Sequence, residues 1–379
     1  MDYSRVSLSC GNSMENFSLE VSSKEKSDAS LNISASTTAE YLPETVRQSI
    51  SGVFEDFEGS KASKPAEAPS NFIKNIPILS RSKDGSKKVQ QYIAKASPED
   101  IKLVVEIILP IINDLMVDVY GNYMCQTLFK SCSPFHRLDI LRALSGRLLA
   151  ISKHGRGTHA LQTLVSLTSL PEEEFIYKTS FTGYILEMAM HPNASYVLQK
   201  LLQSLKNRFF IIEELRDHVT TLVIDKQGLC VLKKCISNYD IFERIASNAS
   251  TFMQDPYGNY AVQIVIDFWK SESVKFIAPQ ISGKVPQLCI QKFSSNVIEK
   301  CLQVEEMKPF VLQEMHSEEN LKIILNSNFG CFVARTAIKS APKDFVEDFR
   351  ASFRKVKPYL HTKSLKNRWE EIEQILNSK

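Results

Sequence analysis

The sequence predicts an all-α protein, an α-solenoid in which eight helical repeats of roughly 36 residues form a crescent. Three observations support this prediction. Glycine is scarce, with 13 in 379 residues, which argues against a β-rich protein full of tight turns. One nine-residue segment recurs eight times without gaps. Within that segment the apolar residues follow one face of an α-helix, and no strand-like alternation accompanies them.

The first 71 residues are predicted to be a disordered, Ser-rich and acidic N-terminal tail. Residues 1–70 hold six Lys and Arg against eleven Asp and Glu, and they end in the linker-like sequence KASKPAEAPS. One fragment, from Thr45 to Phe57, has the spacing of a short amphipathic helix. We interpret it as a transient helix in the tail, with a partner-docking segment as the alternative.

A repeat domain with helical end caps is predicted over residues 72–379. Its repeated segments begin at anchor residues separated by 36, 36, 37, 34, 30, 36 and 36 positions. The anchors are Gly85, Gly121, Gly157, Ala194, Gly228, Gly258, Ser294 and Gly330. A period of this length without strand alternation is typical of stacked helical repeats, none of which can bury its apolar face alone. Positions are counted below as offsets from each anchor.

Offsets three, four, seven and eight are mainly apolar and form one stripe of a helix, which we expect to face the core. A second apolar segment, such as DIKLVVEIILPII, lies between anchors, so each repeat supplies at least two helices. Trp369, Ile372 and Ile375 are expected to pack the final helix over the last repeat. A solvated capping face, with phosphate contact as the alternative, is predicted for Lys355, Lys357, Lys363, Lys366 and Arg368.

Three further columns of the repeated segment lie beside the apolar stripe. Offset one reads Ser86, Asn122, Thr158, Ser195, Leu229, Asn259, Ser295 and Cys331. Offset two reads Lys87, Tyr123, His159, Tyr196, Cys230, Tyr260, Asn296 and Phe332. Offset five reads Gln90, Gln126, Gln162, Gln199, Lys233, Gln263, Glu299 and Arg335. Because offsets one and five are four residues apart on a helix, their side chains point the same way.

This arrangement suits the recognition of nucleobases. A small polar group with an amide four residues later can hydrogen-bond the edge of one base. A ring between them can stack on the face of that base, which contributes roughly 1–3 kcal/mol per base. Surface Gln and Tyr are common in helical repeats, but chance does not explain five Gln in one column beside five aromatic or imidazole side chains in the next. The columns therefore predict a single-stranded nucleic acid bound at one base per repeat.

The segments GNYMCQTL, GNYAVQIV and SSNVIEKCL closely resemble repeats of the Pumilio (PUF) family of RNA-binding proteins. The resemblance covers about residues 72–379, with all eight repeats in order. It implies sequence-specific binding of single-stranded RNA, with each base read by two or three side chains of one repeat. In this family Asn with Gln reads uracil, Ser with Glu reads guanine, and Ser or Cys with Gln reads adenine.

Carried onto this chain, the resemblance implies a base for most repeats. Uracil is implied at Asn122 with Gln126 and at Asn259 with Gln263, since amides both donate and accept. Guanine is implied at Ser295 with Glu299, because its donors suit a carboxylate. Adenine is implied at Ser86 with Gln90 and at Ser195 with Gln199, whereas Thr158 with Gln162 departs from that class. The stacking positions belong to Lys87, Tyr123, His159, Tyr196, Tyr260, Asn296 and Phe332.

Two repeats depart from the family pattern. The fifth has Leu229, Cys230 and Lys233, with neither an amide nor a ring. We therefore expect this repeat not to recognise a base edge, and Lys233 to contact a phosphate group. The eighth has Cys331 and Arg335 around Phe332. Phe332 can stack on a base, but Arg335 replaces the expected Gln and departs from the pattern for uracil.

In the family, RNA runs antiparallel to the repeats, so the implied site is 5′-N-G-U-N-A-(A)-U-A-3′, a UGU-led element of mRNA 3′ untranslated regions. The resemblance implies a cytoplasmic, monomeric repressor of bound messages that recruits decay or translation-repression factors. A nuclear or nucleolar location is the alternative. Two other functions stay open: a degenerate PUF-like protein of ribosome biogenesis that binds structured RNA loosely, and an armadillo- or HEAT-like protein-binding scaffold.

Other functions lack support in the sequence. Motifs such as HExxH and GxSxG are missing, so we expect neither enzyme activity nor a cofactor. The eight Cys residues form no CxxC pair and no His lies with two Cys at ligand spacing, so no metal site is expected. Scattered thiols of this kind are typical of an intracellular protein. No run of about 18 apolar residues occurs, so we expect no membrane partner.

Overall fold

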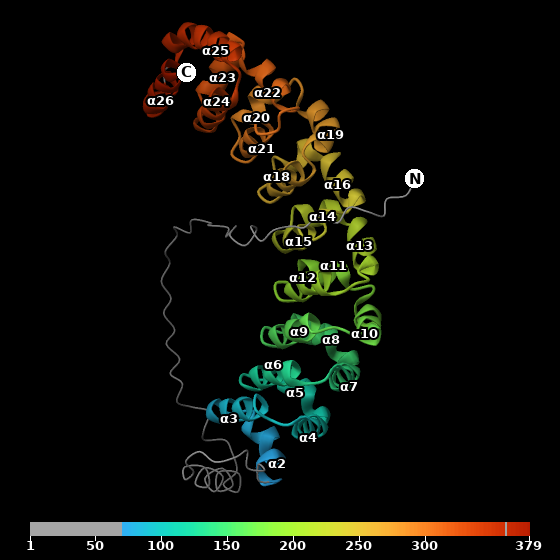
Figure 1. Cartoon of the computed structure of the whole chain (residues 1–379). Helices are drawn as coiled ribbons and strands as arrows, with labels where there is room; N and C mark the ends of the chain where they lie inside the picture. The colour runs from blue at the N-terminus through green and yellow to red at the C-terminus, as the bar shows by residue number, and fades with distance from the viewer. Residues whose placement is uncertain (1–69, 361) are drawn as a thin grey trace. The chain divides into compact units, whose positions relative to one another are not determined.

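The computed structural model describes residues 70–360 and 362–379, which belong to one compact unit of residues 67–379. The predicted helix at Thr45–Phe57 lies outside the described residues. The described residues are helical almost throughout and contain no strand, as the repeat period predicts. Their helices stack in chain order along a curved path, with each repeat touching its neighbours (Figure 1).

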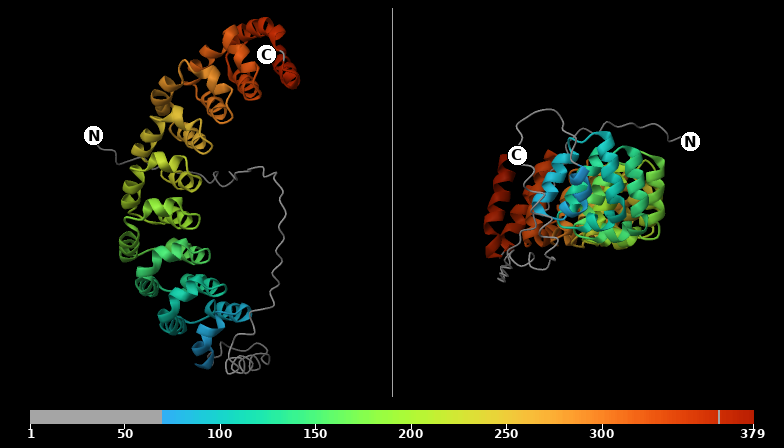
Figure 2. Two further views of the ribbon diagram at one scale, coloured as in Figure 1. Left: turned by 180° about the vertical axis from the view of Figure 1, so that it is seen from behind. Right: turned by 90° about the horizontal axis from the view of Figure 1, so that it is seen from below.

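Each repeat contributes three helices, one more than the minimum of two expected. The inner helices, which carry the repeated segments, are α3 (Lys83–Ile93), α6 (Gly121–Ser131), α9 (Gly157–Ser166), α12 (Ala194–Ser204), α15 (Lys226–Leu232), α18 (Gly258–Trp269), α21 (Ser294–Cys301) and α24 (Asn328–Ser340). The outer helices are α4 (Pro98–Ile108), α7 (Pro134–Leu144), α10 (Pro171–Phe181), α13 (Phe209–Arg216), α16 (Tyr239–Ala246), α19 (Ser271–Ile281), α22 (Lys308–Met315) and α25 (Lys343–Val356). The inner row follows the concave side of the stack in Figure 1, and Figure 2 shows both rows from behind and from below.

A short middle helix connects each outer helix to the next inner one. The middle helices are α5 (Ile112–Val117), α8 (Leu148–Lys153), α11 (Ile185–Met190), α14 (Val219–Val223), α17 (Ala249–Phe252), α20 (Val285–Cys289) and α23 (Glu318–Leu325). In the first repeat α2 (Ser70–Leu79) takes this place. The last helix is α26 (Lys366–Ser378), and four 3₁₀ segments fill the remaining turns: η1 (Leu109–Ile111), η2 (Ser145–Arg147), η3 (Lys357–Tyr359) and η4 (Lys363–Leu365).

The predicted apolar stripe forms the core. Every side chain at offsets four and eight is buried, from Val89 and Ile93 in the first repeat to Ala334 and Ile338 in the eighth. Two of the outer helices, α4 and α7, begin at Ser-Pro pairs. The hydroxyl of Ser97 and that of Ser133 accept a hydrogen bond from the backbone N–H of the third helical residue, and proline fills the first helical position of each helix.

Glycine occupies most anchors because the inner helix begins against a carbonyl of the middle helix. A Cβ on Gly258 would lie 2.5 Å from the carbonyl oxygen of Phe252, and one on Gly330 would lie 2.1 Å from that of Ile324. Ser294 stands at an anchor without glycine, and there the hydroxyl donates to the matching carbonyl of Leu288 at 2.7 Å. This close approach fixes where the polar columns of each inner helix begin.

The final helix caps the array as predicted. Trp369 and Ile372 are buried, Ile375 packs partly buried against the core, and the Trp369 indole N–H donates to the carbonyl of Leu325 at 2.8 Å. Most of the predicted basic capping face is exposed, namely Lys355, Lys357, Lys363 and Lys366. The prediction was wrong for Arg368, which is half-buried with its guanidinium 4.1 Å from the ring centroid of Phe332.

Neighbouring inner helices pack closely along the row, with one exception among those described. α15 and α18 are not closely packed, whereas α12 packs against α15 and α18 packs against α21. The anchors Gly228 and Gly258 are also separated by the shortest step of the repeat array, 30 residues, and α15 has only 7 residues. The inner row is therefore interrupted at the fifth repeat.

Candidate nucleic-acid interface

The first turn of each inner helix carries offsets one and two, and the residue three positions before the anchor holds this turn in place. The Asp118 carboxylate accepts hydrogen bonds from the backbone N–H groups of Tyr120 and Gly121, at 2.9 and 2.8 Å. In the third repeat the Nδ1 atom of His154 accepts from the N–H of Gly157 in the same way, at 3.3 Å. The orphan donors of the helix start are thereby satisfied, and the side chains that follow are fixed in direction.

The offset-one side chains are recessed. The sequence places them beside the core, whereas the structure buries all eight. Ser86 donates to the carbonyl of Tyr120 at 2.9 Å, across to the next repeat. Asn122 donates from Nδ2 to the carbonyls of Asp118 and Val119 within its own repeat. These bonds satisfy polar groups that would otherwise be costly to bury.

Seven of the eight offset-five side chains are half-buried, and four of them reach the offset-one group of the same helix. The Gln126 amide donates to Asn122 Oδ1 at 3.2 Å, and the Gln263 amide donates to Asn259 Oδ1 at 3.0 Å. The same bond joins Gln90 to Ser86 at 3.0 Å and Gln162 to Thr158 at 3.1 Å. Four of the predicted base-edge pairs are therefore single hydrogen-bonded units.

The offset-two side chains point out of the protein. Tyr123, Tyr196 and Tyr260 keep 56%, 52% and 41% of their surface exposed. Lys87, His159 and Asn296 are exposed as well. The offset-two positions in the fifth and eighth repeats, Cys230 and Phe332, are half-buried. In six repeats the stacking position is thus open to a flat ligand.

The pair predicted to read guanine is arranged differently. Glu299 accepts a hydrogen bond from the Thr336 hydroxyl of the next repeat at 2.8 Å, while Ser295 lies against the carbonyl of Lys292 at 3.5 Å. One carboxylate oxygen is therefore held by the eighth repeat, and the carboxylate retains further acceptor capacity.

Sequence reasoning missed this contribution of offset six. Thr127 lies 3.5 Å from Gln90 Oε1, and Thr163 lies 3.4 Å from Gln126 Oε1. With Thr336, three repeats therefore send a hydroxyl at offset six to the offset-five acceptor of the preceding repeat. The signal was available, since threonine recurs in that column, but only the packing shows that it points to the neighbouring repeat.

The fourth and fifth repeats meet through a residue that the columns did not include. Ser195 donates its hydroxyl to Gln227 Oε1 at 3.2 Å, and Gln227 immediately precedes the anchor of the fifth repeat. In the fifth repeat Leu229 is buried, and Lys233 is exposed at the C-cap of the short helix α15. These positions provide neither a base-edge pair nor an exposed ring.

In the eighth repeat the recognition positions contact the end of the chain. Cys331 is buried, and its thiol lies 3.5 Å from the carbonyl oxygen of Leu325. Arg335 forms an ion pair with Glu371 of α26 at 2.8 Å.

Neither a metal centre nor a membrane span is found in residues 70–360 and 362–379. No three His, Cys, Asp or Glu side chains gather there as metal ligands would. No helix in this part of the chain combines the length and the apolar character needed to cross a membrane.

The geometry defines a class of protein: an α-solenoid whose inner face presents a polar pair with an exposed side chain beside it in six of its eight repeats, a surface suited to an extended polymer of flat units. Residues 112–145, 184–216, 218–244, 248–281 and 284–316 match the Pumilio-family RNA binding repeat. Each match runs from a middle helix through an inner helix into the next outer helix, and the matches include the divergent fifth repeat. The chain therefore contains repeats of the Pumilio family.

Known proteins with similar sequences carry the same family name. Pumilio homolog 12 of Arabidopsis thaliana is 30% identical over 279 residues, which cover 70% of this chain and 47% of that protein. Putative pumilio homolog 8, chloroplastic, of the same plant is 27% identical over 301 residues, covering 76% of this chain and 58% of that protein. The chain thus spans about half the length of these relatives.

Solved structures share the fold. The Puf4 RNA binding domain bound to an HO endonuclease RNA 3′ UTR recognition sequence has a TM-score of 0.73 at 24% identity, covering 81% of this chain and 100% of that one. PUF-8 in complex with PBE-RNA has a TM-score of 0.73 at 18% identity, covering 86% and 99%.

Proposed function

We propose that the inner face binds single-stranded RNA in a sequence-specific manner, one base for each repeat that carries a recognition pair, at UGU-type sites whose GU is read by the seventh and sixth repeats. The observation that carries this proposal is the hydrogen-bonded Asn–Gln pair with an exposed tyrosine beside it, present twice, as Asn122, Tyr123 and Gln126 and as Asn259, Tyr260 and Gln263. An amide pair of this kind can donate and accept at one base edge while the ring stacks on its face. The family match to an RNA binding repeat supports the same ligand.

The bases follow from the pairs in antiparallel order. Ser295 with Glu299 would read guanine, Asn259 with Gln263 the uracil that follows it, and Asn122 with Gln126 a uracil further along. Selection of short motifs from a random RNA pool tests the proposal. Enrichment of sequences that contain GU followed by an adenine two positions later is the expected result. A pool without enrichment would contradict RNA reading and favour a protein-binding scaffold.

A second candidate is a PUF-like protein of ribosome biogenesis that binds structured RNA with loose specificity. The specific observation in its favour is that the fifth and eighth repeats lack a free base-edge pair. The same selection separates the two functions, because this candidate predicts a diffuse consensus and retention of folded RNA.

The cellular role we propose is repression of messages that carry such sites in their 3′ untranslated regions, in the cytoplasm, by a monomer that recruits decay or translation-repression factors. A reporter message with one intact site, compared with the same message in which the guanine is changed, measures this role. Equal expression of both reporters would overturn repression without touching RNA binding. Nuclear or nucleolar fluorescence of the tagged full chain would favour the ribosome-biogenesis candidate.

A further inference from the structure

The C-terminal helix α26 continues the inner row in register with the repeats. Lys366, its first residue, follows the anchor Gly330 by 36 residues, the commonest step of the array. α26 packs beside α24 as the inner helices pack beside one another, and Figure 1 shows it at the end of that row. Counted from Lys366, Arg368 stands at offset two and Glu371 at offset five. α26 therefore carries side chains at the positions that the other inner helices use for recognition.

These two side chains are turned onto the recognition positions of the eighth repeat. Glu371 pairs with Arg335, offset five with offset five, at 2.8 Å. The Arg368 guanidinium lies 4.1 Å from the ring centroid of Phe332, offset two on offset two, within the range of a cation–π contact. The Arg335 guanidinium lies over the same ring at 5.3 Å.

The contrast with the other repeats shows what α26 changes. The tyrosines at offset two in the second, fourth and sixth repeats are among the exposed aromatic side chains of the protein, whereas Phe332 is half-buried. The offset-five amides of four repeats donate to the hydrogen-bonding group of their own helix, and those of Gln90 and Gln126 also accept from a threonine of the next repeat. All four are uncharged and half-buried. Arg335 is instead neutralised by a carboxylate from another helix.

α26 is firmly attached to the end of the repeat array. Trp369 and Ile372 are buried beside these contacts, and the Trp369 indole donates to the carbonyl of Leu325. The hydrogen bond from Arg335 lowers the pKa of Glu371, so the carboxylate keeps its charge throughout the neutral range. A base that stacked on Phe332 and reached Arg335 would have to displace a guanidinium and break an ion pair.

We propose that α26 is an intramolecular plug, in which Arg368 and Glu371 occupy the base position of the eighth repeat. Recognition of the RNA then begins at the guanine, which faces the seventh repeat, and the base 5′ of the guanine is not recognised. This inference rests on the proposed RNA binding. It makes Arg368 and Glu371 specificity-determining residues although they lie outside the eight repeats. Their effect is to set the 5′ limit of the recognised sequence.

The test uses the full chain and a set of short RNAs. Four RNAs differ only in the base 5′ of the guanine, and a fifth carries adenine in place of that guanine. The proteins are wild type, the double variant Arg368→Ala with Glu371→Ala, and a matched control on the same helix, Lys366→Ala with Glu370→Ala. Lys366 and Glu370 are both exposed, and the control removes one charge of each sign, as the test variant does. Thermal melting of each protein confirms that it is folded.

We expect wild type and the control to bind the four RNAs with affinities within about twofold of one another, because the site is occupied. The double variant exposes Phe332 and Arg335, and we expect it to separate the four RNAs by about fivefold or more, as a newly available stacking contact does. The plug is overturned if wild type already separates them to that extent, or if the double variant separates them no better than the control. The fifth RNA tests the proposed function separately. If the protein recognises RNA by its sequence, loss of the guanine weakens the binding of every variant, whether or not α26 blocks the eighth repeat.

Discussion

Glu299 is the single carboxylate in the offset-five column, and its position determines what the seventh repeat can accept. A carboxylate facing RNA is unfavourable unless it receives hydrogen bonds from base donors. Guanine offers two adjacent donors, whereas adenine presents an acceptor at one of these positions. Thr336 already donates to one carboxylate oxygen at 2.8 Å and so holds the group in place.

The substitution Glu299→Gln gives the seventh repeat the Ser–Gln pair found in the first repeat, where the Gln90 amide donates to the Ser86 hydroxyl. We expect the preference at this RNA position to shift from guanine towards adenine by roughly 1–3 kcal/mol, the scale of a good bidentate base contact in DNA recognition. The measurement is binding of both proteins to two RNAs that differ only at that base. Equal binding of all four combinations would show that the seventh repeat does not read the base.

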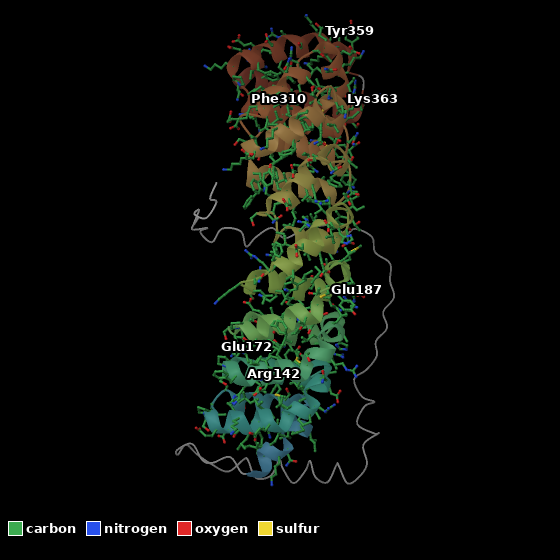
Figure 3. All side chains as sticks on the ribbon, turned by 90° about the vertical axis from the view of Figure 1, so that its right-hand side faces the viewer. Arg142, Glu172, Glu187, Phe310, Tyr359 and Lys363 are labelled. Atoms are coloured by element: carbon green, nitrogen blue, oxygen red, sulfur yellow. The ribbon has the colours of Figure 1, made fainter. Side chains whose placement is uncertain are left out.

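Tyr260 is exposed on the inner row and lies outside the apolar stripe. We expect Tyr260→Ala to weaken RNA binding by roughly 1–3 kcal/mol, the loss of one stacked base, and to leave the melting temperature nearly unchanged. Tyr359→Ala is the matched control, since Tyr359 is even more exposed and lies on the face shown in Figure 3, away from the inner row. A large fall in melting temperature with unchanged binding would show that the Tyr260 ring supports the fold instead.

The buried thiols should be chemically inert. Burial raises the pKa of Cys301 to about 12, and it likewise raises the pKa of Cys235 to about 12. Because a raised pKa lowers the thiolate fraction, these groups stay protonated at pH 8 in the folded protein. Cys230 is half-buried, so alkylation followed by mass spectrometry should find it modified well before the other two. Modification of Cys301 as fast as Cys230 in the folded protein would contradict this burial.

The recognition columns could be predicted at the residue scale because helical spacing alone places offsets one and five on one side. The burial of the offset-one group could not be predicted, because it depends on how closely two inner helices approach. Ser86, for example, is buried by a contact with the carbonyl of Tyr120 in the next repeat. Arg368 was misplaced for a related reason: a charged residue on a terminal helix usually faces solvent, and only the packing of α26 on α24 directs it to Phe332.

At the scale of the element, the inner helices were predicted more completely than the middle ones. The inner helices carry a full apolar stripe, which the repeat brings out eight times. The middle helices have between 4 and 8 residues, so they show too little periodicity to be separated from the outer helix that precedes them. The sequence indicates the middle helices only through the anchor glycines, which allow an inner helix to begin close to a carbonyl group of the middle helix.

Two outer helices are joined by a buried ion pair. Arg137 of α7 lies 3.7 Å from the Glu173 carboxylate of α10, and both side chains are almost fully buried. Arg137 also donates to the carbonyls of Cys132 and Leu167, while Glu173 accepts from the backbone of Leu170. The ion pair and these hydrogen bonds to backbone groups beside the helix ends therefore connect the second repeat to the third.

We expect Arg137→Met to lower the free energy of unfolding by roughly 3–5 kcal/mol, because it leaves the carboxylate buried without its cation. The control is Arg142→Met on the same helix, whose partner Asp139 is exposed and whose ion pair should contribute about 0–1 kcal/mol. Arg142 lies on the outer face in Figure 3. Chemical denaturation of both variants makes the comparison, and equal losses would mean that the buried pair has no special role.

At the scale of the whole repeat domain, each repeat contacts mainly its neighbours, so local departures stay local. The sequence showed the departure of the fifth repeat as a shortened step and a lost Gln. It did not show the consequence, which is that α15 and α18 are not closely packed while the rest of the inner row is continuous. The spacing between successive recognition positions is therefore set by helix packing everywhere except at this junction.

This difference leads to a prediction about RNA length. One nucleotide inserted between the bases that face the fifth and sixth repeats should weaken binding by less than about threefold, because Leu229 and Lys233 offer no edge pair and α15 is not closely packed against α18. One nucleotide inserted between the bases of the second and third repeats should cost far more, since α6 and α9 pack closely and both Gln126 and Gln162 are in place to read. Each stacked base that is forced out of register lowers the binding free energy by roughly 1–3 kcal/mol. Binding of the two insertion RNAs against the parent measures this. Equal losses would show that the junction of the fifth and sixth repeats spaces bases as strictly as the others, and that the interruption in the inner row has no effect on recognition.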